Sequence, residues 1–416
     1  MAGPSTTPIA SGGMQKSAKS SQSKTMQNKT VVVTGCTHGI GKETAAALAS
    51  KGATVIMACR NTQLAEQVAD SIRSQHPDAS IIVGPKLDLS SQQSVRDFAL
   101  AYIEKGWPLH CLINNAGAID NGEPWYTSEG VGGLCQVNYL GPFTLTRLLE
   151  QQLIKNAPSR VVNVSSITHR FSYIGAPETF LTNWKQGSNY GNSKLANALF
   201  AFECNRRLGL CGVHSCAVDP GSVGSSIWEN NKIFSSGFLK WAIATLYAPS
   251  EDGAAAVVHA ASVPWEEEKA VAAKINAKWN TRHSIVNSSS TINTTSTSDE
   301  DARFYARGMF SWPTITSFRG MVNPKKERSV FEKIREGAYG LTALVHSAAD
   351  WPVRKLSGGA LVAETRLVPA APLCYNRELA KKLWEVSCEA ANLPLMPVGR
   401  QDTANVELVE AGVKAK

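Results

Sequence analysis

The sequence predicts an α/β fold, a doubly wound parallel sheet with a long insertion toward its C-terminal end. Three observations predict it. Short β-branched runs alternate with helical patterns from Thr30 onward, a glycine-rich turn follows the first run, and the alternation stops after about residue 264 and returns near residue 358. Strands separated by helices of this length form right-handed βαβ units, whose parallel sheet is covered by helices on both faces.

Each element follows from its own stretch of sequence. Runs rich in Val, Ile and Thr are typical of buried strands, and they predict strands at 30–34, 54–58, 81–83, 109–114, 160–164 and 213–218. Apolar residues three or four positions apart indicate helices, which we expect at 40–50, 63–73, 92–105, 137–152 and 190–208. This alternation is typical of a Rossmann-type layout, in which ligands bind at the carboxyl ends of the strands.

The length of 416 residues accommodates one large domain with extensions, and we expect that domain at 29–393. Tails are predicted at 1–28 and 394–416. We interpret residues 266–357 as an insertion, because no period can be assigned to most of it; its stretch 284–299 is polar and of low complexity, as in a flexible loop. A strand at 360–367 and a helix at 378–391 are expected to complete the sheet after the insertion.

The net charge of +8 does not by itself indicate nucleic-acid binding, which we do not expect. Half of the excess lies before the first acidic residue, Glu43, on four lysines: Lys16, Lys19, Lys24 and Lys29. We interpret this segment as a solvated tail; contact with an acidic membrane surface or partner, or a targeting role, stays an alternative. No apolar run reaches about 18 residues, so we expect no spanning helix and a cytoplasmic location, with or without membrane association.

The nine cysteines are odd in number and scattered along the chain. No two of them are spaced as a Cys-x-x-Cys pair. The pattern therefore predicts reduced thiols in an intracellular protein, and it argues against a disulfide framework or a zinc site. No metal centre is expected.

The turn after the first strand has the composition of a phosphate-binding loop. It runs from Thr34 to Gly41, and a helix follows at once. Glycine is needed where the backbone turns tightly and approaches a pyrophosphate, and the helix N-terminus offers free N–H groups to the anion. We therefore expect the cofactor to contact Gly35, Thr37, His38, Gly39, Ile40 and Gly41. A plain tight turn is the alternative.

A guanidinium at the end of the second strand predicts NADP(H) as the cofactor. Arg60 stands where an acidic residue would bond the ribose hydroxyls of NAD. It can hold a 2′-phosphate through two parallel hydrogen bonds, and Lys42 adds positive potential; a surface charge is the alternative. Asp88 is expected to accept from the adenine amino group. The same edge is expected to include Leu89, Asn115, Ala116 and Gly117.

Tyr190 and Lys194 form the expected proton-transfer pair. They lie one helical turn apart on the same face, so their Cβ atoms are about 5–6 Å apart. An ammonium at this distance lowers the pKa of a phenol from about 10, and such a tyrosine can donate a proton to a carbonyl or accept one from an alcohol. Lys194 can also bond the nicotinamide ribose. A helix-surface pair is the alternative reading of this spacing.

Two further polar residues are predicted at the same edge. Ser165 and Ser166 follow the strand 160–164, where a hydroxyl can polarise the substrate oxygen. Asn138 begins a helix expected beside the one that starts at Tyr190, and its amide can hold a water that relays protons to Lys194. The combination of these residues with the glycine turn, in this order, is more specific than any one of them.

With these motifs in place, the chain resembles the short-chain dehydrogenase/reductase family over residues 29–264 and 358–393. Within it, "IMACRN", "LHCLINNAG", "VNVSSITHRF" and "KKLWEVS" are similar to the retinol dehydrogenases and to the oxidoreductase part of WW-domain-containing oxidoreductase. The resemblance implies that Ser166, not Ser165, is catalytic. It also implies that three residues pass beside the nicotinamide carboxamide: Pro220, Gly221 and Val223. Thr37 and Asp219 depart from the usual asparagine and histidine, and Gly224-Ser225 from a usual threonine.

The resemblance also implies where the substrate binds. Residues 227–247 are apolar and aromatic and are expected to form a lid for a lipophilic carbonyl or alcohol, retinoid-like or steroid-like. Peripheral membrane contact through this segment, or a helix packed on the core, are alternatives. For the whole protein, the alternatives to a reductase are a cofactor-binding scaffold or sensor with negligible turnover, and a protochlorophyllide-reductase-like enzyme. His169 is assigned no role, and a homo-oligomer is left open.

Overall fold

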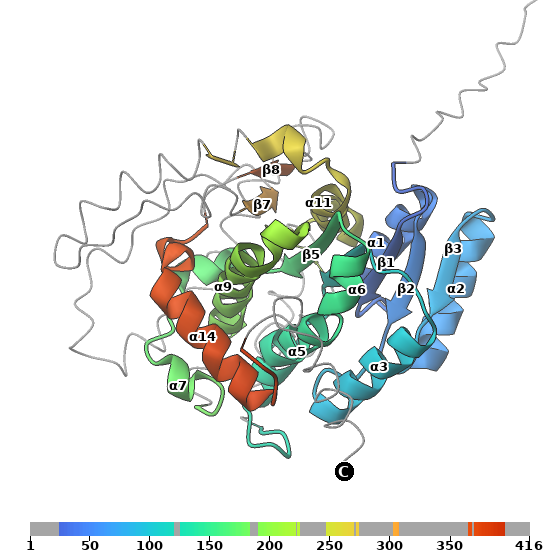
Figure 1. Cartoon of the computed structure of the whole chain (residues 1–416). Coiled ribbons are helices and arrows are strands. Elements are labelled where there is room, and N and C mark those ends of the chain that lie inside the picture. The colour runs from blue at the N-terminus through green and yellow to red at the C-terminus, as the bar shows by residue number, and fades with distance from the viewer. Residues whose placement is uncertain are drawn as a thin grey trace, which may run out of the picture.

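An eight-stranded sheet lies at the centre of the computed structural model (Figure 1), with the strand order β3-β2-β1-β4-β5-β6-β7-β8. Strands β1 to β7 are parallel and β8 is antiparallel to β7. The strands are β1 (Thr30–Thr34), β2 (Thr54–Ala58), β3 (Ser80–Val83), β4 (Cys111–Asn114), β5 (Ser159–Val164), β6 (Val213–Asp219), β7 (Arg303–Arg307) and β8 (Thr365–Leu367). The structure describes residues 25–119, 125–183, 190–221, 223–224, 247–269, 272–273, 303–307, 365–367 and 370–395.

Helices cover both faces of the sheet. One face carries α1 (Gly39–Ser50), α2 (Thr62–Gln75) and α11 (Ser250–Ser262), and the other carries α3 (Gln92–Glu104), α5 (Gly141–Leu148) and α9 (Tyr190–Leu208). Helix α14 (Arg377–Ala390) packs on the outer side of α9, away from the sheet (Figure 1). Shorter helices are α4 (Gly133–Cys135), α6 (Glu150–Lys155), α7 (Pro177–Phe180), η2 (Ile167–Phe171), η3 (Gly209–Cys211), η5 (Glu266–Glu268) and η9 (Pro372–Tyr375).

The inner strands form around apolar runs because helices cover both faces of the sheet. In β1, Val31 and Val33 belong to the core cluster beneath α1 and α2, whereas Val32 belongs to the cluster on the α9 side. All five residues of β1 are buried. The doubly wound α/β fold predicted from the sequence is thus confirmed, and β2 and α9 have the predicted bounds.

The predicted insertion contains part of the sheet. Strand β7 lies within 266–357 and pairs with β6 in parallel, Cys216 opposite Arg303. One segment of the range interpreted as an insertion, 266–357, thus supplies the seventh strand. The predicted strand at 360–367 is described only as β8, and the low-complexity stretch 284–299 lies outside the described residues.

The boundaries of both predicted tails also shift. Met26 is buried and its N–H donates to the Lys51 carbonyl at 3.1 Å, so the folded part begins before residue 29. At the other end, the carbonyls of Pro394 and Leu395 accept hydrogen bonds from Arg147 and Trp384. All nine cysteines are free thiols, and eight are buried. In the described part of the chain, no helix combines the length and apolar character that crossing a bilayer requires.

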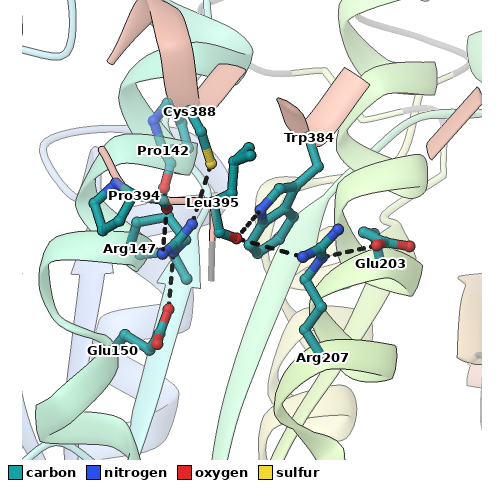
Figure 2. Close-up of polar contacts among 10 residues, drawn as sticks. Pro142, Arg147, Glu150, Glu203, Arg207, Trp384, Cys388, Pro394 and Leu395 are labelled. Carbon is teal, nitrogen blue, oxygen red and sulfur yellow. Dashed lines mark hydrogen bonds and ion pairs between the residues drawn. The ribbon is translucent and has the colours of Figure 1, made fainter. Parts of the chain in front are cut away.

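The α14 helix attaches to the domain through an aromatic and ionic cluster around Trp384. The Trp384 ring centroid lies 5.1 Å from that of Phe143 on α5 and 5.9 Å from that of Phe200 on α9. Two guanidinium groups lie over the same ring, Arg147 at 5.0 Å and Arg207 at 4.6 Å. Figure 2 shows that each arginine is in turn bonded to a glutamate, Glu150 or Glu203. The cluster fixes the C-terminal helix across α5 and α9.

Candidate active site

The turn between β1 and α1 is closed by backbone positions that only glycine tolerates well. Gly35 has φ +71° and Gly39 has φ +54°, both in the left-handed region. A Cβ on Gly41 would lie 2.1 Å from the Gly35 carbonyl oxygen and 2.4 Å from the Asn115 amide nitrogen. The two ends of the turn therefore meet directly, with no room for a side chain at Gly41.

The N-terminus of α1 fits an anionic group. Helices α2, α3 and α14 are capped by the side chains of Asn61, Ser91 and Asn376, whereas the N-cap of α1, His38, caps nothing. Thr37 Oγ1 lies 2.9 Å from His38 Nδ1, so these two exposed side chains contact one another instead. Uncapped N–H groups at a glycine-rich helix start suit a pyrophosphate. The residues of this turn therefore fit the phosphates of a dinucleotide.

Replacing Gly41 by alanine is expected to weaken NADPH binding by about tenfold or more, because the new Cβ forces the turn open and misdirects its amides. Titration of the purified chain with NADPH, followed by cofactor fluorescence, measures the effect. Gly209→Ala is the matched control, since its Cβ would meet only the Asn205 side chain, at 3.8 Å. Equal affinities for the two variants would contradict the assignment.

One hydroxyl connects this turn to the segment after β4. Thr34 Oγ1 accepts from the N–H groups of Asn115 and Ala116, both at 3.0 Å, and donates to the Ile113 carbonyl at 3.3 Å. The Asn115 amide donates back to the carbonyls of Thr34 and Gly35 at 2.9 and 3.2 Å. Asn115, Ala116 and Gly117 thus lie beside the glycine turn, where the sequence placed them.

The predicted adenosine residues gather beyond β2. Arg60 is exposed, two positions after Ala58, whose carbonyl accepts from the Gly35 N–H at 2.9 Å. Asp88 is half-buried, and its carboxylate accepts from the Ser90 amide and hydroxyl. Leu89 is buried and its carbonyl accepts from Gln136. Arg60 is therefore free to meet a ligand at this edge, whereas the Asp88 carboxylate is already hydrogen-bonded within its own loop.

The structure brings Ser166, Tyr190 and Lys194 together between β5 and α9. Lys194 Nζ lies 5.4 Å from the Tyr190 ring centroid and donates to the Val164 carbonyl at 3.0 Å. The neighbouring Ser165 hydroxyl donates to the Lys194 carbonyl at 2.8 Å, so Ser165 is used structurally. Ser166 hydrogen-bonds Tyr190 through its side chain. A hydroxyl, a phenol and an ammonium thus share the carboxyl edge of the sheet.

The protonation of this group differs from the expectation. Burial raises the pKa of Tyr190, and the nearby Asp219 carboxylate raises it further, whereas the Ser166 hydrogen bond lowers it in part. Burial also lowers the pKa of Lys194 to about 8. The predicted lowering of the tyrosine pKa by Lys194 is therefore wrong. The physical reason is that burial and the Asp219 carboxylate both favour the neutral phenol.

Asn138 lies in a π-helical turn, Gln136–Leu140, that interrupts the helix predicted at 137–152. Such turns often occur at functional sites. Asn138 Oδ1 accepts from the Ala118 N–H at 2.7 Å, and Nδ2 donates to the Ala118 carbonyl and to Ser193 Oγ. A Cβ on Gly117 would lie 3.3 Å from Lys194 Nζ and 3.4 Å from Asn138 Oδ1, so all three residues adjoin the same space.

The segment after β6 completes the crevice. Pro220 is buried, Gly221 has φ +82°, and the Gly221 N–H donates to Asp219 Oδ1 at 3.0 Å. A Cβ on Gly253 of α11 would touch both Val223 and Ile40, at 2.6 and 3.1 Å. Val223 and Ile40 of the glycine turn therefore both lie against Gly253 of α11. The predicted lid at 227–247 lies outside the described residues except for Tyr247.

The structure places two further residues, His169 and Asp219, at the candidate site. His169 contacts the Ser166 carbonyl and the Ala371 N–H, and Asp219 accepts from the backbone N–H groups of Gly221 and Ile167. Asp219 was noted only as a departure from a family pattern. Their partners lie far apart in sequence, 202 positions for His169 and Ala371, so no local signal could have revealed them.

Comparison with known proteins agrees with this geometry. A family model described as short chain dehydrogenase matches residues 29–233. Human retinol dehydrogenase 11 is 42% identical over 221 residues, which make up 52% of this chain and 66% of the human protein. Retinol dehydrogenase 12 of Mus musculus is 40% identical over 240 residues, 56% of this chain and 73% of the mouse protein. WW domain-containing oxidoreductase of Gallus gallus is 38% identical over 254 residues, 58% of this chain and 60% of that protein.

A solved structure shares the fold. The crystal structure of an uncharacterized protein from Mycobacterium paratuberculosis aligns with a TM-score of 0.53 at 23% identity, covering 89% of this chain and 95% of that one. The predicted resemblance to retinol dehydrogenases and to WW domain-containing oxidoreductase is confirmed by the sequence relatives. On the strength of the sheet, the glycine turn and these relatives, the chain belongs to the short-chain dehydrogenase family of oxidoreductases, which bind nicotinamide cofactors.

Proposed function

We propose that this chain is an NADP(H)-dependent oxidoreductase that interconverts a carbonyl and an alcohol on a lipophilic substrate. The observation that carries the proposal is the meeting of Ser166, Tyr190 and Lys194 at the carboxyl edge of the sheet. An uncapped helix N-terminus lies at the same edge, ready for a pyrophosphate. One face of the crevice thus fits a dinucleotide, and the other carries the groups for proton transfer.

The described residues divide the chemistry between them. A bound nicotinamide supplies or accepts the hydride. The Ser166 hydroxyl orients the substrate oxygen next to Tyr190, whose phenol exchanges the proton with that oxygen. The raised pKa keeps Tyr190 protonated at neutral pH, which suits a proton donor to a carbonyl. Lys194, whose Nζ lies 5.4 Å from the Tyr190 ring centroid, would bond the ribose hydroxyls of a bound nicotinamide cofactor.

The NADP(H) preference is supported by Arg60, an exposed cation at the end of β2. Arg60→Ala is expected to lower kcat/KM for NADPH by about 10- to 100-fold, since charge-assisted hydrogen bonds to a phosphate are lost. The same variant used with NADH is the internal control, because NADH lacks the 2′-phosphate and its kcat/KM should stay within about twofold. An equal loss with both cofactors would show that Arg60 does not read the phosphate.

The substrate class is supported by the relatives, two of which are named retinol dehydrogenases. NADPH oxidation by the purified chain should be screened against all-trans-retinal, medium-chain aldehydes, quinones and ketosteroids. We expect the apolar aldehydes to be reduced most efficiently. If the chain bound NADPH tightly but none of these compounds caused it to oxidise NADPH, the protein would be a cofactor-binding scaffold and not an enzyme.

A further inference from the structure

His169 lies between Ser166 and a segment from the far end of the chain. It is on η2, 0% exposed, and its Nδ1 lies 2.6 Å from the Ser166 carbonyl oxygen. Its Nε2 lies 3.0 Å from the backbone nitrogen of Ala371. One imidazole ring therefore touches both the peptide of the serine and the chain that returns after β8.

The two contacts fix which ring nitrogen carries the proton. The Ala371 N–H can only donate, so Nε2 must be the acceptor. The Ser166 carbonyl can only accept, so Nδ1 must carry the hydrogen and donate it. Burial lowers the pKa of His169 to about 3, in agreement with a neutral ring. His169 thus bridges the two segments: its Nε2 accepts a hydrogen bond from Ala371, and its Nδ1 donates one to Ser166.

The opposite side of the Ser166 peptide is held by Asp219. Its carboxylate, 4% exposed, accepts from the N–H of Ile167 and from the N–H of Gly221. The carbonyl and the N–H of the single Ser166–Ile167 peptide unit are therefore bonded to two buried side chains. One of these, Asp219, belongs to the strand beside it, and the other, His169, depends on Ala371.

The segment that reaches His169 is itself firmly packed. The Ala371 carbonyl accepts from the Cys374 N–H at 2.9 Å, and the Ala370 N–H donates to Tyr375 Oη at 3.2 Å. Cys374 is fully buried, and the Tyr375 ring lies 5.3 Å from Phe202 of α9. Residues 370–375 are thus packed against α9, the helix that begins at Tyr190. This packing holds the Ala371 N–H in place.

We propose that His169 is a positioning residue for Ser166 and that, through it, segment 370–375 is a working part of the active site. The inference rests on the proposed function in one respect, because the placement of Ser166 affects turnover only if Ser166 meets the substrate. The structural part of the inference, that residue 371 is coupled to residue 166, does not depend on enzymatic activity.

Two substitutions separate the ends of the bridge. In His169→Asn the amide nitrogen is as many bonds from Cα as Nδ1, so the donor toward Ser166 is kept and the acceptor for Ala371 is lost. In His169→Gln the amide oxygen is as many bonds from Cα as Nε2, so the acceptor is kept and the donor is lost. We expect His169→Gln to lower kcat with all-trans-retinal by about 30-fold or more, the range of a lost positioning contact, at an unchanged KM for NADPH. His169→Asn should lower kcat less, by about three- to tenfold, because the donor toward Ser166 is kept but the ring's support at Ala371 is lost.

A third variant breaks the bridge at its far end and leaves the imidazole in place. Ala371 has φ −60°, which proline adopts readily. Ala371→Pro removes the N–H that donates to His169, and its ring pushes the segment away from the imidazole. We expect kcat to fall while NADPH affinity is kept, although residue 371 is remote from the catalytic groups in sequence.

Amide hydrogen exchange of the full chain tests the coupling between residue 371 and residue 166. We expect faster exchange at the Ile167–His169 amides in His169→Gln and Ala371→Pro, and faster exchange at 371–374 in His169→Asn. Unchanged exchange at 167–169 in both of the first two variants would overturn the coupling. Normal kcat in His169→Gln, with an active wild type, would overturn the positioning role. A wild type that binds NADPH but reduces no aldehyde would instead refute the proposed function, and the exchange results would still decide the coupling.

Discussion

Tyr190→Phe is expected to lower kcat by about 10²- to 10⁴-fold, the range supplied by a positioned proton donor. The phenyl ring keeps the packing against Lys194 and removes only the hydroxyl that Ser166 bonds. NADPH affinity should stay within about twofold, because no phosphate contact is altered. The measurement is NADPH oxidation with all-trans-retinal beside a fluorescence titration of the cofactor.

Tyr126→Phe is the matched control for this variant. Tyr126 is an exposed tyrosine in the segment before α4, and loss of its hydroxyl should leave kcat unchanged. If Tyr190→Phe kept the wild-type rate, Tyr190 would not be the proton donor, and the interpretation of the serine and lysine would fall with it.

Trp384→Ala is expected to lower the free energy of unfolding by about 3–5 kcal/mol. The indole is 1% exposed, packs on Phe143 and Phe200, and donates to the Leu395 carbonyl. Its removal also leaves the buried Arg147–Glu150 pair, joined at 2.8 Å, beside a cavity. Breaking the surroundings of a buried ion pair adds to the cost of the lost packing.

Urea unfolding followed by circular dichroism measures this change. Leu210→Ala is the control, since Leu210 is 85% exposed and its truncation should alter the stability by less than about 0.5 kcal/mol. A loss below about 1 kcal/mol in Trp384→Ala would mean that α14 contributes little to the stability of the domain.

The first six strands could be predicted because each contains a short apolar run that the sheet buries in large part. Strand β7 could not, because its three apolar residues stand between two arginines and none of them is β-branched. Arg303 is fully buried there, with its guanidinium 3.5 Å from the centroid of the Trp265 ring. The Trp265 ring covers the Arg303 guanidinium and makes its burial in the sheet favourable. Trp265 is distant from Arg303 in sequence, so no local pattern predicts this contact.

The candidate site likewise contains residues that the sequence predicts and contacts that only the fold reveals. Gly35, Tyr190 and Lys194 are recognisable because the turn and the helix impose fixed spacings on them. The pKa of Tyr190 was predicted in the wrong direction, because burial and Asp219 act through neighbours that only the fold brings close. The π-turn at Asn138 and the bridge at His169 likewise depend on contacts with Ala118 and Ala371, which the sequence does not place beside them.

The position of α14 bears on how the protein is made. Helix α9 ends at residue 208, whereas α14 begins at residue 377. During synthesis, Phe143 and Phe200 therefore leave the ribosome long before Trp384 can cover them. A nascent chain with an uncovered aromatic surface is prone to aggregate, so we expect translation of this protein to depend on chaperones until α14 has emerged.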